Sequence, residues 1–272
     1  MKIIRVFPRR TKATPDDDLV RIKSFPGLFD QADEIHISVA FTWDIPLAEK
    51  LARAWSIVAP VRMGGPAMNE PGGDFVSGKY LKPGYVITSR GCPNHCWFCA
   101  VPKREGNIIR ELPIIDGYNI LDDNLLACSD KHIKSVFEML SQQKEPIEFT
   151  GGLEAARLKP WHAEEMKKLK TKQIFFAYDT PDDLEPLQIA GKIMVEAGHE
   201  MHPKSHALRC YVLCGYGTDT MDKAEKRMKE TMQAGFTPMA MLWKNETGKR
   251  NPDWGKFQRE WARPQIIYAR KK

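Results

Sequence analysis

From Tyr85 onward, short apolar runs alternate with amphipathic stretches along the chain. The apolar runs are typical of buried strands, and the stretches between them have the periodicity of helices. Six strands are expected, at residues 85–89, 118–123, 147–152, 174–179, 208–216 and 236–243. Four helices are expected between them, at residues 130–143, 160–170, 182–197 and 219–234. Because strand and helix take turns, the pattern predicts an α/β fold with a parallel sheet and crossover helices.

The number of these units predicts an incomplete barrel. A complete barrel of eight strand and helix units takes about 250 residues. Six units over the roughly 160 residues that follow Tyr85 therefore fit a partial (β/α)6 TIM-like barrel. The carboxyl ends of its strands would form the catalytic end.

The pattern before Tyr85 is different. Strands are expected at residues 3–6, 34–41 and 57–63, with a helix at 46–56. These elements predict a small Rossmann-like α/β unit. Residues 64–84 are rich in glycine and proline and are expected to form a connector. The predicted organisation is an N-terminal unit with its connector, the partial barrel and an extension that packs on the barrel, at residues 1–84, 85–243 and 244–272.

The composition is that of an ordinary globular protein. The 272 residues are 42% apolar, which is enough to fill a core. No stretch approaches the roughly 20 apolar residues of a membrane span, and the basic start of the chain does not resemble a signal peptide. A cytoplasmic location without membrane contact is therefore expected.

The charge balance bears on the substrate. A net charge of +6 suits an anionic substrate such as a nucleotide or a nucleic acid. The 41 basic and 35 acidic residues are interleaved, however, which is also typical of an ordinary solvated surface. Both interpretations remain open at this point.

Three of the six cysteines, Cys92, Cys96 and Cys99, lie on one short stretch. Disulfides are rare in a reducing compartment, where clustered thiols usually bind metal or take part in catalysis. A zinc site would need a fourth ligand from His95 or from distant cysteines. A 4Fe-4S cluster held by three thiolates would leave one iron open to another molecule, which suits catalysis. The spacing therefore favours the iron-sulfur cluster, with zinc as the alternative.

The spacing C-x-x-x-C-x-x-C, with Phe98 directly before the last thiol, resembles the signature of the radical S-adenosylmethionine (radical SAM) superfamily. The motif follows an expected strand, YVITS, as it does in that superfamily. The stretch TSRGCPNHCWFC is most similar to the branch that contains cobalamin-dependent radical enzymes and methylthiotransferases. Phe98, inside the motif, is expected to lie beside the cofactors.

The resemblance implies an oxidoreductase mechanism. The three cysteines would hold a 4Fe-4S cluster whose open iron chelates the amino and carboxylate groups of SAM. An electron from a donor such as flavodoxin or ferredoxin would cleave SAM. The resulting 5′-deoxyadenosyl radical would take a hydrogen atom from a substrate that the sequence does not identify.

Candidate SAM-binding residues follow the second and third expected strands. Asp122, Asp123 and Asn124 end the second strand, where the resemblance implies acidic residues near the SAM amino group. The alternative is that they cap the helix that follows. Gly151 and Gly152 end the third strand and permit close approach of the backbone.

Three further polar residues follow the third and fourth strands. Glu154 and Arg157 are expected to point into the mouth of the barrel. Arg157 is a candidate partner of the SAM carboxylate, or one half of a surface ion pair. Asp179 ends the fourth strand, where related enzymes place a polar side chain near the ribose. Asp before Thr-Pro is also typical of an ordinary turn and cap.

Cys210 and Cys214 lie four residues apart on the fifth expected strand and so share one face. We expect that face to point inward, with Tyr211 and Leu213 toward the helices. Cys214, at the catalytic end, is then a candidate catalytic residue that supplies a hydrogen atom, holds a second cofactor or contacts substrate. The alternative is that both cysteines are small buried core residues.

Two other functions remain as alternatives. The N-terminal unit resembles the end of a cobalamin-binding domain, so a cobalamin-dependent radical SAM methyltransferase is the first. Cobalamin binding is doubtful because the D-x-H-x-x-G motif is absent. A methylthiotransferase is disfavoured because residues 1–91 contain no further cysteines. The second alternative is a noncatalytic iron-sulfur or zinc module whose basic residues at 101–104 contact nucleic-acid phosphate.

Overall fold

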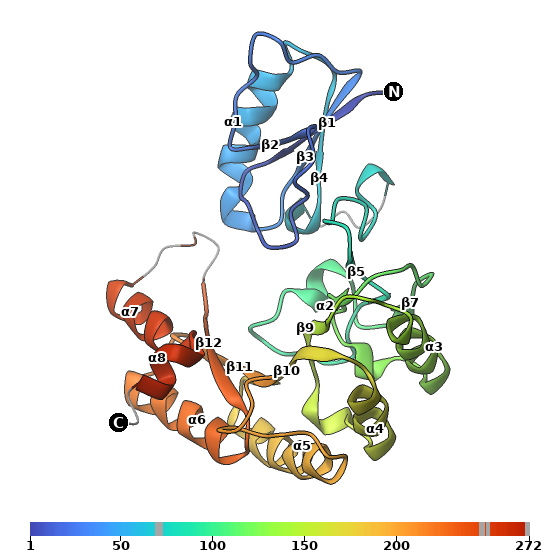
Figure 1. Ribbon diagram of the computed structural model, residues 1–272. Coiled ribbons are helices and arrows are strands. Elements are labelled where there is room, and N and C mark those ends of the chain that lie inside the picture. Colours follow the sequence, from blue (N-terminus) through green and yellow to red (C-terminus); the bar gives the residue numbers. More distant parts are fainter. Residues whose placement is uncertain (69–72, 245–247, 249–250, 270–272) are drawn as a thin grey trace.

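The computed structural model describes residues 1–68, 73–244, 248 and 251–269 (Figure 1). In this part of the chain the protein is an α/β fold with two separate parallel sheets and one antiparallel strand pair. Two distinct clusters of buried apolar residues accompany the two parallel sheets. No helix among the described residues is long and apolar enough to cross a membrane.

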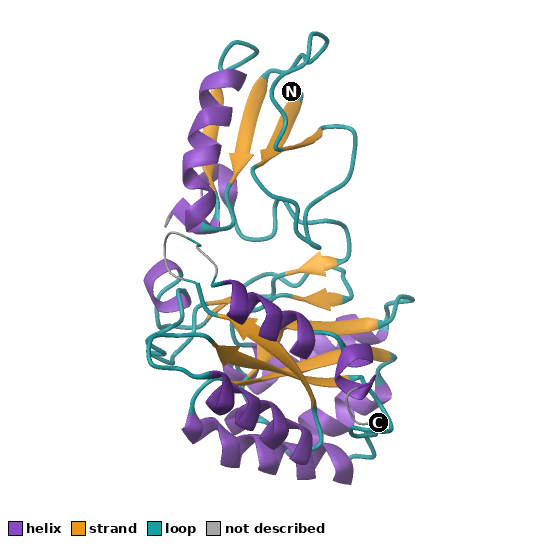
Figure 2. Ribbon diagram, turned by 90° about the vertical axis from the view of Figure 1, so that its left-hand side faces the viewer, coloured by secondary structure: helices purple, strands orange, loops and turns teal. Residues whose placement is uncertain are grey.

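The N-terminal sheet has four parallel strands in the order β2-β1-β3-β4. Their bounds are β1 Ile3–Phe7, β2 Val20–Ile22, β3 Glu34–Ser38 and β4 Val61–Gly64. Helix α1 (Ile45–Trp55) lies along one face of this sheet (Figure 2). It buries Ala48, Leu51 and Trp55 there, because their spacing places them on one side of the helix. The three predicted strands and the helix are confirmed, and the short strand β2 was not predicted.

The connector covers the other face of the N-terminal sheet. His36 of β3 is 1% exposed, and its ring hydrogen-bonds the Tyr80 hydroxyl of the connector and the Glu34 carboxylate. Two short 3-10 turns, η2 (Pro66–Met68) and η3 (Gly73–Phe75), lie in this segment. Phe75 packs so closely on β4 that a Cβ at Gly64 would lie 2.4 Å from its ring, which explains the glycine.

The larger sheet has six parallel strands that lie side by side in chain order. They are β5 (Tyr85–Val86), β8 (Asn119–Ile120), β9 (Ile147–Leu153), β10 (Thr171–Tyr178), β11 (Leu208–Cys214) and β12 (Thr237–Leu242). Four helices connect them, at α3 (Asp130–Ser141), α4 (Pro160–Lys168), α5 (Leu184–Glu196) and α6 (Met221–Gln233). A strand or helix therefore forms at each predicted position.

The first two strands of this sheet are much shorter than predicted. After Val86 the chain leaves the sheet and forms β6 (Ser89–Arg90), which pairs antiparallel with β7 (Arg110–Glu111). The cysteine segment and the short helix α2 (Val101–Arg104) lie between β6 and β7. The strand is therefore shorter than the apolar run predicted, because the Thr88 backbone N–H donates to the Asp122 carboxylate and Ser89 pairs with β7.

Two further helices follow β12. They are α7 (Pro252–Trp261) and α8 (Pro264–Ala269), and α7 packs against β12. Phe257, Trp261 and Ile267 join the apolar cluster of the larger sheet. Of the predicted extension, residues 245–247, 249–250 and 270–272 lie outside the described part of the chain.

Candidate functional site

The cysteine segment is a loop that closes on itself at its base. Cys92 donates its backbone N–H to the carbonyl of Gly106 at 3.3 Å. Gly91 has a φ of +89°, and a Cβ there would lie 2.2 Å from the Ile108 carbonyl oxygen. Only glycine fits this crossing, which brings both ends of the loop together.

The three loop cysteines are partly buried thiols without disulfide bonds. Asn124 donates its side-chain N–H to Cys92 Sγ at 3.4 Å, and the Val101 backbone N–H lies 3.5 Å from Cys99 Sγ. Burial and the charges of Cys99 and Cys92 raise the pKa of Cys96 to about 11. Three thiols on one loop, two of them with N–H donors, are a donor set that fits an iron-sulfur cluster.

The three loop cysteines do not form a site for a single metal ion. In the described residues, no three His, Cys, Asp or Glu side chains are arranged so that they could hold one metal ion. A 4Fe-4S cluster does not need such convergence, because each thiolate binds a different iron.

Asp122 and Asp123, at the end of β8, are bound to the protein itself. Asp122 is 2% exposed and accepts hydrogen bonds from the Thr88 N–H, the Thr88 hydroxyl and the Ser89 hydroxyl at 2.6, 2.6 and 2.7 Å. Burial raises the pKa of Asp122, and these bonds partly offset that rise. Both oxygens of Asp122 thus have partners within the protein, and a role of this carboxylate toward SAM stays a prediction.

Asp123 also has a structural partner on each oxygen. It accepts hydrogen bonds from Arg90 Nη1 at 2.9 Å and from the Gly91 N–H at 3.0 Å. Its side chain is only 8% exposed. Asp123 therefore holds the start of the cysteine loop on the end of β8. The capping alternative is wrong for both aspartates, because the Ser129 side chain caps α3.

Asn124, Glu154 and Arg157 come together beside Cys92. The Oε2 atom of Glu154 accepts hydrogen bonds from Asn124 Nδ2 and from Arg157 Nε, both at 2.6 Å. Asn124 is 3% exposed, and its Oδ1 atom has no hydrogen-bond partner among the described residues. This group joins three of the predicted residues to the first cysteine of the loop.

The two glycines of β9 have different roles. A Cβ at Gly151 would lie 2.3 Å from the Asp122 carbonyl oxygen, so this glycine lets β9 approach the end of β8. Gly152 has a φ of +93°, and its nearest neighbour is the Tyr211 ring at 3.7 Å. Gly151 permits close approach to the backbone that follows β8, and a role of either glycine in cofactor binding stays a prediction.

Asp179 lies directly after β10, near the cysteine loop. Burial and the nearby Asp183 carboxylate raise the pKa of Asp179 to about 7. The charges of both aspartates also raise the pKa of Cys96, so the end of β10 lies within electrostatic reach of that thiol. Asp183 accepts the N–H groups of Asp179 and Thr180 at 2.9 and 2.7 Å, so Thr180 and Asp183 form the cap here, and a role of Asp179 near the ribose stays a prediction.

The aromatic residues of the loop connect it to the far strands of the sheet. The Phe98 ring lies 5.4 Å from that of Trp97, between centroids, and Trp97 lies 5.2 Å from Tyr216. Tyr216 follows β11, so the loop reaches from β5 to the carboxyl end of β11. The sequence contained no signal for this contact, because Tyr216 lies far from Trp97 along the chain.

Cys210 and Cys214 face the helices, so the predicted orientation is wrong. Tyr178 of β10 lies opposite Val212 of β11, and its hydroxyl donates to Glu230 of α6 at 2.7 Å. Residues 210, 212 and 214 therefore lie on the helix-covered face. Both cysteines are 0% exposed, and burial raises the pKa of Cys214 to about 12. The interpretation as buried core residues is the one that the geometry favours.

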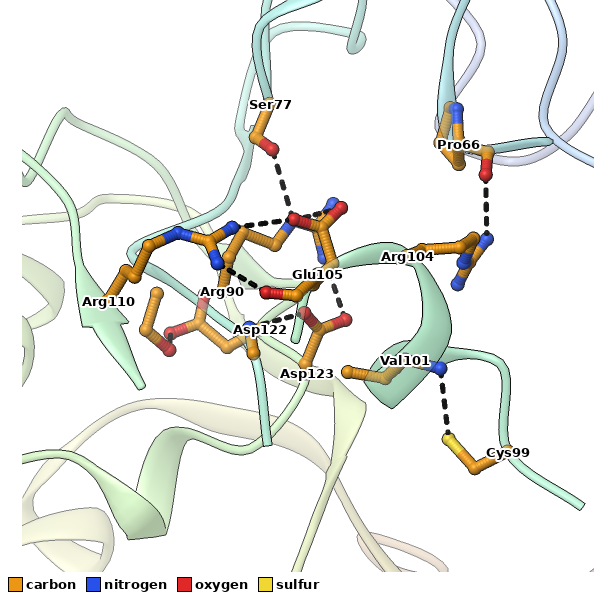
Figure 3. A network of polar contacts seen from close by, with 12 residues as sticks. Pro66, Ser77, Arg90, Cys99, Val101, Arg104, Glu105, Arg110, Asp122 and Asp123 are labelled. Atoms are coloured by element: carbon orange, nitrogen blue, oxygen red, sulfur yellow. Dashed lines mark hydrogen bonds and ion pairs between the residues drawn. The ribbon is translucent and has the colours of Figure 1, made fainter. Parts of the chain in front are cut away.

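A cluster of arginines and carboxylates that the sequence did not indicate supports the cysteine loop (Figure 3). Arg90 donates to Asp123 and to the Ser77 hydroxyl, and it lies 4.0 Å from Glu105. Arg110 pairs with Glu105 at 2.8 Å. These residues lie on both arms of the loop and on the connector, so only the tertiary structure brings them together.

The comparisons with known proteins add no relative. The chain matches no protein-family model, and no curated protein shows significant similarity to it. The candidate site therefore rests on its own residues and geometry.

Proposed function

We propose that the protein is a radical SAM enzyme that acts on an unidentified substrate. Cys92, Cys96 and Cys99 would hold a 4Fe-4S cluster. The observation that carries the proposal is the group formed by Asn124, Glu154 and Arg157 against Cys92. In this group Asn124 donates an N–H to the Cys92 thiol. The Glu154 carboxylate suits the ammonium group of SAM, and the Arg157 guanidinium suits its carboxylate.

The fold that we propose for the larger unit is a partial (β/α)6 TIM-like barrel. Six parallel strands follow one another in chain order, with helices between them. In such a barrel the carboxyl ends of the strands carry the site. Glu154 and Asp179 directly follow the carboxyl ends of β9 and β10, and Asn124 lies in the segment after β8, which agrees with this arrangement.

The residues of the chain have separate tasks in this proposal. When bound, the cluster would supply the electron for reductive cleavage of SAM and thereby the radical chemistry on the substrate. The N–H groups of Asn124 and Val101 orient and stabilise the thiolates of Cys92 and Cys99. Glu154 would bind the SAM ammonium group.

Arg157 would bind the SAM carboxylate. Its Nε donates to Glu154, and its side chain is 39% exposed, so the guanidinium can accept a second anion from the solvent side. Flavodoxin or ferredoxin is the class of electron donor that we propose. The overall charge of +6 supports an anionic substrate.

Anaerobic reconstitution tests the proposal. The wild-type chain should bind about four irons and form 5′-deoxyadenosine from SAM under a strong reductant. Cys96→Ala should lose both properties, while Cys210→Ala, a thiol buried away from the loop, should keep both. A Cys96→Ala protein that cleaves SAM at the wild-type rate would refute the proposal. Stoichiometric zinc that excludes iron would instead support the noncatalytic module.

A further inference from the structure

A small pocket separates the N-terminal unit from the cysteine loop. Its volume is about 90 Å³, and it is lined by residues of β3, the segment after β4, the connector and the cysteine loop. The polar side chains of the lining are those of Ser38, Ser77, Tyr80, Arg90, Arg104 and Glu105. The N-terminal sheet and the cysteine loop thus both contribute to one pocket, which shares Ser77, Arg90 and Glu105 with the cluster that supports the loop and adds Arg104.

Arg104 of α2 is the lining cation that lacks an acidic partner. Among the described residues, no carboxylate lies within ion-pair distance of its guanidinium. Its Nη1 atom lies 3.5 Å from the Pro66 carbonyl oxygen, a long contact that Figure 3 shows apart from the other arginines. Its Nε atom is buried without a hydrogen-bond partner in the described part of the chain. Buried unpaired donors are rare and costly, so this one indicates a missing acceptor.

The other charges around the pocket are already neutralised. Arg90 is bound by Asp123 and Ser77, and Glu105 is bound by Arg110. This group contains three arginines, Arg90, Arg104 and Arg110, and two carboxylates, Asp123 and Glu105. The positive charge of Arg104 is therefore not balanced within the group. A ligand that balances it must carry negative charge.

The size and the remaining donors identify the kind of anion. A volume of about 90 Å³ has room for several water-sized atoms, which matches a phosphate group rather than a whole nucleotide. The Ser38 and Ser77 hydroxyls and the Arg104 guanidinium are donors that suit phosphate oxygens. We propose that this pocket binds one phosphate group of a small phosphorylated ligand, with Arg104 as its principal contact.

This site adjoins the proposed cluster, because the charge of Arg104 favours the thiolate form of Cys99, but the pocket is lined by none of the three cysteines. Arg104 lies five residues after Cys99, so a ligand held there would lie next to the cysteine loop. The phosphate group would then anchor a substrate whose remaining part extends out of the pocket. Phosphate binding can be measured on protein with and without iron, which separates this proposal from the proposed function.

Titration calorimetry with inorganic phosphate tests the pocket on the full-length chain. Arg104→Gln should weaken binding by about tenfold or more, since a charge-assisted contact contributes about 1.5 to 3 kcal/mol. Arg104→Lys, which keeps the charge and loses the planar fork, should give an intermediate affinity. Lys103→Gln is the matched control, because Lys103 is exposed on the same helix and loses the same charge.

The outcomes distinguish a built site from general attraction. Wild-type affinity in Lys103→Gln, together with weak binding in Arg104→Gln at unchanged circular dichroism, supports the pocket. Equal weakening in both variants, or none in Arg104→Gln, refutes it. Acetate that binds more tightly than phosphate would refute the assignment to phosphate. The same phosphate affinity in iron-free protein shows that the pocket exists whether or not the cluster forms.

Discussion

The side-chain amide of Asn124 donates a hydrogen bond to the Sγ atom of Cys92 at 3.4 Å. The same amide nitrogen lies 2.6 Å from Glu154 Oε2. One buried side chain thus connects the end of β8, the segment after β9 and the first cysteine of the loop. Any group bound by that cysteine would be held through Asn124 to the sheet.

Replacement of Asn124 by alanine should weaken retention of the cluster. The change removes the donor to Cys92 and leaves the Glu154 carboxylate with one donor fewer, at a cost of about 1 to 3 kcal/mol. Iron per chain after exposure to a chelator measures the effect. Asn107→Ala, an exposed asparagine of the same loop, is the control and should retain iron as the wild type does. Equal retention by Asn124→Ala and wild type would show that the hydrogen bond has no such role.

The raised pKa of Asp179 predicts a specific pH dependence of stability. Its pKa is about 7 in the folded protein, against about 3.9 in an unfolded chain. The folded state therefore binds a proton more tightly, and this contribution to stability is complete below about pH 4 and is lost as the pH rises to about 7.

Asp179→Asn should remove this dependence. At about pH 8 the free energy of unfolding of the variant, measured with urea, should exceed that of the wild type by roughly 1 to 2 kcal/mol. At about pH 4 the two free energies should agree. Asp182→Asn, at an exposed neighbour, should change stability by less than about 0.5 kcal/mol at either pH. A variant that gains as much at low pH as at high pH would contradict the titration.

Cys210→Ala and Cys214→Ala should behave alike. Both thiols are fully buried on the helix-covered face of β11, so each change should cost about 0.5 to 1.5 kcal/mol of unfolding free energy. Iron content and 5′-deoxyadenosine formation should stay at the wild-type level. Chemical unfolding and iron assay measure both. A selective loss of product in Cys214→Ala would restore a catalytic role for that residue.

Gly151→Ala should destabilise the end of the larger sheet. The added Cβ would lie 2.3 Å from the Asp122 carbonyl oxygen, so β9 must move away from β8 at a cost of about 1 to 3 kcal/mol. Gly255→Ala is the contrasting control in α7, where the nearest atom is Arg259 Nη1 at 3.7 Å. That helix position should gain up to about 1 kcal/mol. Thermal unfolding of both variants shows whether the steric contact at Gly151, rather than the loss of a glycine as such, lowers the stability.

The sequence alone was sufficient for the order of elements in the larger unit. Strands and helices form at the predicted positions because burial of one face imposes a short apolar period on strands and a longer one on helices. It also placed Asn124, Glu154 and Arg157 separately among the candidate SAM-binding residues, and the structure brings these three together beside Cys92. The reason is that parallel strands place their carboxyl ends at the same edge of a sheet.

Only the tertiary structure decided the roles of several residues. In the sequence Asp122 and Asp123 are two adjacent carboxylates without an evident partner. In the structure they accept hydrogen bonds from residues more than thirty positions away, namely Thr88, Ser89 and Arg90. Alternation along β11 placed Cys210 and Cys214 on one face, but it could not determine which. That choice depends on α6, whose Glu230 binds the neighbouring strand.

The role of Arg104 was likewise decided only by the tertiary structure. In the sequence it belongs to a basic stretch that any solvated surface could carry. The pocket around it exists because β3, the segment after β4 and the connector pack against α2. Local periodicity records which residues are buried, whereas the partner of each polar group is set by chain segments far away in sequence, and a single sequence contains no record of those contacts.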